Sequence, residues 1–91
     1  MPVGLWVVRL HISAATARKI SGRHGLSSQE VQDAVELRAG LRYVWHEDPT
    51  RGRRALVECY IRRQRIVAVL YPADSPMGDE YNLGSAYPER P

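Results

Sequence analysis

The first part of the chain alternates between apolar and polar residues, with Arg9 and His11 interrupting an apolar stretch over residues 5–12. A period of two is typical of a strand with one buried face. The residues predicted to face the core are Trp6, Val8, Leu10 and Ile12. The apolar run over residues 3–12 is too short to span a bilayer and lacks the charged start and cleavage site of a signal peptide, so we interpret it as a strand.

Capping residues then predict two helices. Ser13 suits the N-cap of a first helix, and Gly25 suits its C-terminal end. Ser27 and Glu30 have the spacing of an S-x-x-E capping box, which predicts that a second helix begins directly after Ser27. We expect this second helix to end at Gly40.

From residue 41 the period returns to two, and the predicted strands span residues 41–46, 53–62, 65–71 and 80–87. Residues 65–71 are almost wholly apolar, which favours the central place in the sheet. In the last strand, Gly84 and its polar neighbours are poor strand formers and indicate a bulge or an edge. Trp45, like Trp6, is expected in the core.

The order of one strand, two helices and four strands predicts a single α+β domain over residues 1–91. We expect an antiparallel sheet of about five strands with both helices packed on one face. The opposite face is then open to solvent. By alternation this open face carries Arg54, Glu58, Tyr60 and Arg62, and Arg9 and His11 join it if the first strand lies beside the other four.

Charge is distributed unevenly along the chain, which has 13 Lys and Arg against 10 Asp and Glu. Residues 51–65 contain six arginines and a single acid, Glu58. Arginine suits bidentate phosphate recognition, so this segment indicates a polyanionic partner such as RNA, although a general compositional bias towards arginine explains it equally well. The candidate RNA-binding residues are Arg51, Arg53, Arg62, Arg63 and Arg65.

Metal-independent RNA cleavage needs groups that move protons and a group that stabilises the phosphorane. His46 and Arg54 provide both types close together in one predicted hairpin. Tyr60 and Glu58 are further proton-transfer candidates on the predicted open face, so the candidate catalytic residues are His46, Arg54, Tyr60 and Glu58. The alternative is a solvated turn whose acids pair with its arginines and strand tyrosines that only pack.

Other classes of site lack their sequence patterns. The single cysteine, Cys59, has no partner for an intramolecular disulfide and lies on a face predicted to be buried. Three scattered histidines do not form a metal site, and no glycine-rich phosphate loop occurs. We therefore expect no metal and no cofactor, and the cytoplasm as the compartment.

Four short motifs carry a resemblance to a known family: RHGLSSQEV over residues 23–31, RGRRALVE over 51–58, VLYP over 69–72 and NLGSAYP over 82–88. In these motifs the chain resembles the small toxins related to BrnT within the RelE-like superfamily. The resemblance implies a RelE-like antiparallel sheet with helices on one face, cytosolic endoribonuclease activity and neutralisation by a cognate antitoxin. Toxins of this group carry an arginine directly after the Ser-Ala of the final strand, where this chain has Tyr87.

Two hypotheses follow. The first is an RNA-cleaving toxin module of a toxin–antitoxin pair, with RNA and the antitoxin as partners and phosphate contacts from the arginines of residues 51–65. The second is a non-catalytic RNA- or protein-binding module on the same scaffold. Tyr87 in place of an arginine favours the second, and the proximity of His46 to Arg54 favours the first.

Overall fold

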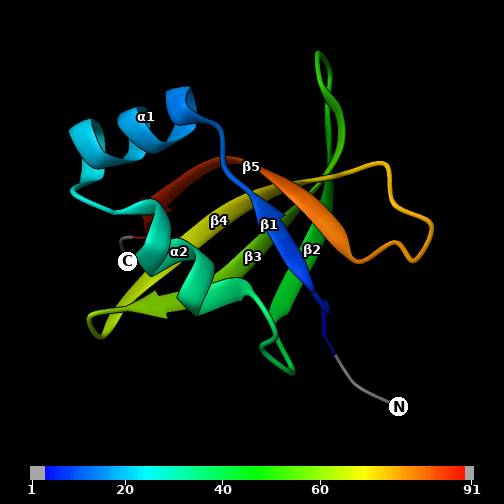
Figure 1. The fold of residues 1–91 in the computed structure, drawn as a ribbon, viewed down its shortest axis with the longest axis horizontal. Helices are drawn as coiled ribbons and strands as arrows, with labels where there is room; N and C mark the ends of the chain where they lie inside the picture. The colour runs from blue at the N-terminus through cyan, green and yellow to red at the C-terminus, as the bar shows by residue number, and fades with distance from the viewer. Residues whose placement is uncertain (1–3, 90–91) are drawn as a thin grey trace.

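Two helices cover one face of a five-stranded sheet (Figure 1). This computed structural model describes residues 4–89, so Val3, at the start of the first predicted run, lies outside the described residues. In chain order the elements are β1 (Arg9–His11), α1 (Ala14–His24), α2 (Ser28–Val35), β2 (Arg42–Asp48), β3 (Gly52–Ile61), β4 (Gln64–Pro72) and β5 (Glu80–Pro88). The predicted α+β class and order of elements are confirmed.

The strands lie in the order β1-β5-β4-β3-β2, with the last four forming an antiparallel meander. β4 is central, as predicted. The sheet is mostly rather than wholly antiparallel, because β1 pairs with β5 in the parallel direction. β5 is therefore an inner strand, and its predicted irregularity is a bulge: Val69 pairs with Ser85 and Leu70 with Leu83, which leaves Gly84 as the extra residue.

The core lies between the helices and the sheet. Alternate residues of β3 point into it, and Ala55, Val57, Cys59 and Ile61 are buried as predicted. The helices contribute Ile20, Val31 and Val35, which are fully buried. α1 packs on β5 and α2 packs on β3, so the two helices cover the sheet from β5 to β3.

Local capping sets the helix ends. The Ser13 hydroxyl accepts from the Thr16 N–H at 3.1 Å, and Gly25 ends α1 with φ 65°. Both bonds of the Ser27–Glu30 capping box are formed. α2 stops at Val35 rather than at Gly40, because the chain turns there to meet the N-terminal segment.

That early end has a visible cause. Leu37 adopts φ 57°, and its N–H donates to the Val7 carbonyl at 2.8 Å. A continued helix would carry this N–H away from Val7. The sequence pattern missed the end because it depends on a partner 30 residues earlier in the chain.

Both tryptophans and Val8 were predicted to face the core, and these predictions are wrong, since all three are exposed. Trp6 is 45% exposed, because Leu5 and Val7 are the residues that point inward before the segment changes register at Val8. The Val8 N–H donates to Asp79 O at 2.8 Å, and regular pairing begins only at Arg9. Trp45 is 38% exposed, because β2 extends beyond the helices.

Candidate functional site

The face of the sheet opposite the helices carries two polar clusters at opposite ends of β3. The first, which we call the hairpin cluster, lies where β2 turns into β3 and consists of His46, Asp48, Arg54 and Tyr71. The second, the Glu58 cluster, lies towards the other end and consists of Arg42, Glu58, Tyr60 and Arg65.

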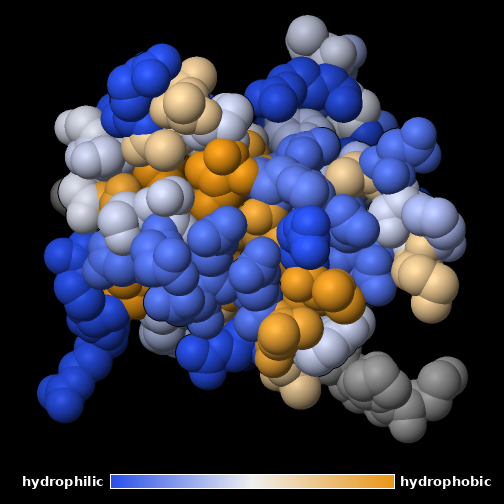
Figure 2. Space-filling view, in the orientation of Figure 1, coloured by the Kyte–Doolittle hydropathy of each residue, from blue (hydrophilic) through white to orange (hydrophobic). Residues whose placement is uncertain are grey.

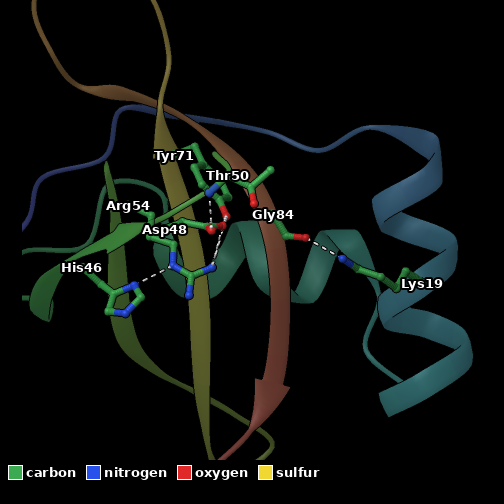
Figure 3. Close-up of polar contacts among 7 residues, drawn as sticks. All are labelled: Lys19, His46, Asp48, Thr50, Arg54, Tyr71 and Gly84. Atoms are coloured by element: carbon green, nitrogen blue, oxygen red, sulfur yellow. Dashed lines mark hydrogen bonds and ion pairs between the residues drawn. The ribbon is translucent and has the colours of Figure 1, made fainter. Parts of the chain in front are cut away.

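In the hairpin cluster, Arg54 is held by three side chains (Figure 3). Its Nη1 donates to the Tyr71 hydroxyl at 3.2 Å and lies 3.4 Å from Asp48 Oδ2. Its Nε donates to His46 Nδ1 at 3.1 Å. The Tyr71 hydroxyl in turn donates to Asp48 Oδ2 at 3.2 Å, so the guanidinium is fixed in one orientation.

Strand register explains this arrangement. His46 pairs directly with Arg54 across β2 and β3. Ala55 pairs with Leu70, which places Tyr71 beside Arg54 at the next position. Asp48 closes the turn, where its Oδ1 accepts the Thr50 N–H at 3.1 Å.

The charges of the cluster are well defined at neutral pH. The Thr50 N–H holds the pKa of Asp48 below its ordinary value, and the Tyr71 hydroxyl and the Arg54 guanidinium act in the same direction. The hydrogen bond to Tyr71 raises the pKa of Arg54, with a further contribution from Asp48. Asp48 is thus an anion and Arg54 a cation across the physiological range.

Beside the cluster lies a pocket of about 290 Å³, whose polar lining includes Lys19, Asp48, Arg51, Arg54, Tyr71 and Tyr87. Lys19 reaches it from α1, and its ammonium donates to the Gly84 carbonyl at 2.7 Å. The Arg51 guanidinium lies 4.2 Å from the centre of the Tyr71 ring. Three cations against one carboxylate leave the pocket with a positive excess, which suits an anion.

Gly84 is essential to the shape of this pocket. A Cβ atom built at this position lies 2.4 Å from Cε2 of Tyr71, so any side chain would displace the ring. Gly84 is also the bulged residue of β5, and its own carbonyl accepts the hydrogen bond from Lys19. The residue that weakens the strand pattern in the sequence therefore makes room for Tyr71.

In the Glu58 cluster, the carboxylate of Glu58 is shared by two arginines and a tyrosine. Glu58 Oε1 accepts from the Tyr60 hydroxyl at 3.1 Å and lies 2.8 Å from Arg65 Nε, while Arg42 Nε lies 3.7 Å from Glu58 Oε2. Six residues separate Arg54 from Tyr60 along β3, which corresponds to roughly 20 Å of extended strand. The four candidate catalytic residues thus form two separate pairs, His46 with Arg54 and Glu58 with Tyr60.

The arginines of residues 51–65 do not form one surface. Both hairpin tips are hydrophilic, one at each end of β3 (Figure 2). Arg51 and Arg53 lie at the first tip, where Arg53 stacks over Trp45 at 3.9 Å. Arg62 and Arg63 form the second tip, with φ values of 52° and 64°.

Arg62 does not lie on the open face as predicted. The turn directs it towards α2, where its Nε lies 3.1 Å from Glu30 Oε2 and its Nη2 donates to the Gly25 carbonyl at 3.0 Å. Arg65 is on the open face, but it is paired with Glu58. Arg9 and His11 lie on β1, where His11 Nε2 is 2.9 Å from Glu80 Oε1.

Sequence reasoning missed the pocket residues contributed by distant elements. Lys19, in the first predicted helix, and Tyr71, at the end of a predicted strand, are not among the candidate site residues of the sequence analysis. The signal for Tyr71 was available, since alternation along β4 places it on the open face with Val67 and Val69. No sequence signal links Lys19 to Gly84, because that contact depends on how α1 docks.

Burial raises the pKa of the Cys59 thiol to about 11, so it is not a nucleophile in the folded protein. Among residues 4–89, no group of three or more His, Cys, Asp or Glu side chains is arranged to hold a metal ion. Within the same range, no helix is long and apolar enough to cross a membrane.

Comparison of the chain with protein-family models, with curated proteins and with solved structures finds no match. Its function therefore has to be argued from the geometry of the pocket and the hairpin cluster.

Proposed function

We propose that the chain is a cytoplasmic, metal-independent endoribonuclease of the toxin type, with its active site at the pocket beside the hairpin cluster. One observation carries the proposal: three cations and two tyrosines line a single pocket on the open face, and a histidine, His46, is hydrogen-bonded to one of those cations, Arg54. This combination suits the phosphate of a single-stranded RNA, with tyrosine rings available for stacking on bases. The cognate antitoxin would be a protein that blocks this pocket.

The cleavage step needs the RNA 2′-oxygen to bond to phosphorus while the bond to the 5′-oxygen breaks. Arg54 and Arg51 would stabilise the charge on the phosphorane. His46 Nδ1 accepts the Arg54 Nε–H in the structure. A bound phosphate would compete for that N–H and free Nδ1 to take the proton of the 2′-hydroxyl.

A proton must also reach the departing 5′-oxygen. Lys19 and Tyr87 line the pocket and are the donors best placed to supply it. Tyr87 occupies the position at which the related toxins carry an arginine, so the positive charge supplied there by the toxins would come from Lys19 and Arg51 in this chain. Glu58 and Tyr60 have no direct role in this proposal.

The test is cleavage of a mixed single-stranded RNA by the purified protein with divalent metals chelated. We expect His46→Ala to lower the cleavage rate by roughly 10²–10⁴-fold, the usual contribution of one acid or base. Arg54→Lys keeps the positive charge but loses the planar, bidentate geometry of the guanidinium, so its cleavage rate should also fall sharply. Arg63→Ala removes a positive charge at the distant tip and serves as the matched control, with activity close to that of the wild type.

Two further readings complete the experiment. Thermal melting of each variant separates loss of activity from loss of folding. RNA affinity should fall as the salt concentration rises. The logarithm of the association constant should decrease with the logarithm of the salt concentration, with a slope of about −0.7 for each phosphate contacted. A folded wild type that binds RNA and leaves it uncut, with or without ribosomes, would support the non-catalytic RNA-binding module instead. A wild type that does not bind RNA would contradict both RNA hypotheses and leave the protein-binding module.

A further inference from the structure

A five-stranded open sheet has two edges, and in this protein they differ. At the outer edge of β1, the Leu10 N–H donates to Glu36 Oε2 at 2.7 Å, and the Leu10 carbonyl accepts from Gln32 Nε2 at 3.1 Å. These two side chains come from α2 and the residue that caps it. The backbone groups that could recruit another strand at this edge are therefore already bonded.

The outer edge of β2 has no comparable cover within residues 4–89. Within this range β2 pairs with β3 on its inner side. The isolated bridge between Leu5 and Leu41 lies just before β2 begins. Six of its seven residues are exposed. Seven residues span about 23 Å, which is long enough to pair with a further strand.

β2 also lacks several of the features that usually protect an edge strand from pairing. It contains no proline and no lysine, and its pairing with β3 runs without a bulge. At its centre Tyr43, Val44 and Trp45 are 37%, 61% and 38% exposed. Three consecutive exposed apolar side chains, on an edge that no strand of residues 4–89 covers, favour pairing.

The order of charges along β2 identifies the partner. The strand begins with basic Arg42 and ends with acidic Glu47 and Asp48. An antiparallel second copy of the strand brings each basic end to the other's acidic end, whereas parallel pairing sets like charges together. The strand is thus complementary to itself in the antiparallel direction.

We propose that two copies of this chain pair antiparallel through β2, with the two-fold axis at Val44. Side chains directly across a continuous sheet share a face, so Val44 meets the partner's Val44 and Tyr43 meets the partner's Trp45. Arg42 then lies diagonally to the partner's Asp48, and two aromatic pairs flank the axis. The axis is perpendicular to the sheet, so both open faces, each with its own pocket, lie on one side of a ten-stranded sheet.

The first test is the mass of the wild-type protein in solution over a range of concentrations. We expect a dimer at micromolar concentrations. Val44→Lys places a charge at the axis and should weaken the dimer by about tenfold or more. Leu37→Lys is the matched control, because Leu37 is 63% exposed and lies outside β2, and this variant should dimerise like the wild type.

The second test fixes the register. A Val44→Cys variant treated with a short bifunctional maleimide should give a covalent dimer, while Leu37→Cys should not. Cys59 is 3% exposed and should not compete for the reagent. A wild type that stays monomeric, a dimer that persists in Val44→Lys, or cross-linking at residue 37 but not at 44 would each overturn the proposal, whether or not the protein cleaves RNA.

Discussion

At the scale of single residues, Gly84 controls the pocket without contributing a side chain to it. We expect Gly84→Ala to push the Tyr71 ring away from Arg54 and Asp48, because the new Cβ would lie 2.4 Å from Cε2 of Tyr71. Overpacking of this kind costs about 1–3 kcal/mol of unfolding free energy. RNA affinity should fall as well. Chemical denaturation measures the unfolding free energy, and filter binding measures the RNA affinity.

Gly22→Ala is the matched control for this prediction. Gly22 lies in α1, and nothing is within 4 Å of an added Cβ atom. The same change there should stabilise the protein by roughly 0.5–1 kcal/mol, because glycine is unfavourable inside a helix. Equal effects of the two substitutions would show that the contact with Tyr71 does not matter.

The residues of the pocket also show how far sequence reasoning reaches. His46 and Arg54 could be placed together because one short hairpin joins them. Tyr71 depends on the register of the next hairpin, and Lys19 on the docking of a helix against β5. Contacts over long sequence separations are set by packing of the whole sheet, which a local pattern does not contain.

At the scale of elements, the turn between β3 and β4 holds two arginines in left-handed backbone, a conformation that costs an L-residue about 1–2 kcal/mol. We expect Arg63→Gly to raise the unfolding free energy by about 1 kcal/mol, because glycine adopts φ 64° without strain. Arg65→Gly, the same change within β4, should instead destabilise the protein, since it weakens the strand and removes the pair with Glu58. Thermal melting of the two variants checks this, and an Arg63→Gly protein less stable than the wild type would contradict the prediction.

Elements defined by local chemistry were the most predictable part of the fold. Ser13, Ser27 and Glu30 marked the helix starts correctly, because capping bonds span only three residues. The buried face of β3 also followed from alternation. The errors at Trp6, Trp45, Arg62 and the end of α2 arose where the outcome depends on contacts with a neighbouring element.

At the scale of the whole molecule, protection of the backbone should fall from the centre of the sheet to its edges. β4 is the central strand, and both strands that flank it are themselves inner strands, so its amides should exchange with deuterium most slowly. The outward-facing amides of β2 should exchange fastest in dilute protein and slow down as the concentration rises and copies pair. Hydrogen exchange followed by mass spectrometry checks both, and β2 amides as slow as those of β4 in dilute protein would contradict this picture.

The pairing of β1 with β5 and the contact of Lys19 with Gly84 join the beginning of the described chain to its end. A ribosome makes the chain from its N-terminus, so α1 and β1 emerge well before the strand on which they pack. The pocket therefore does not exist until Tyr87 has left the exit tunnel. If the pocket cleaves RNA, a nascent chain cannot cut its own message before that stage of synthesis.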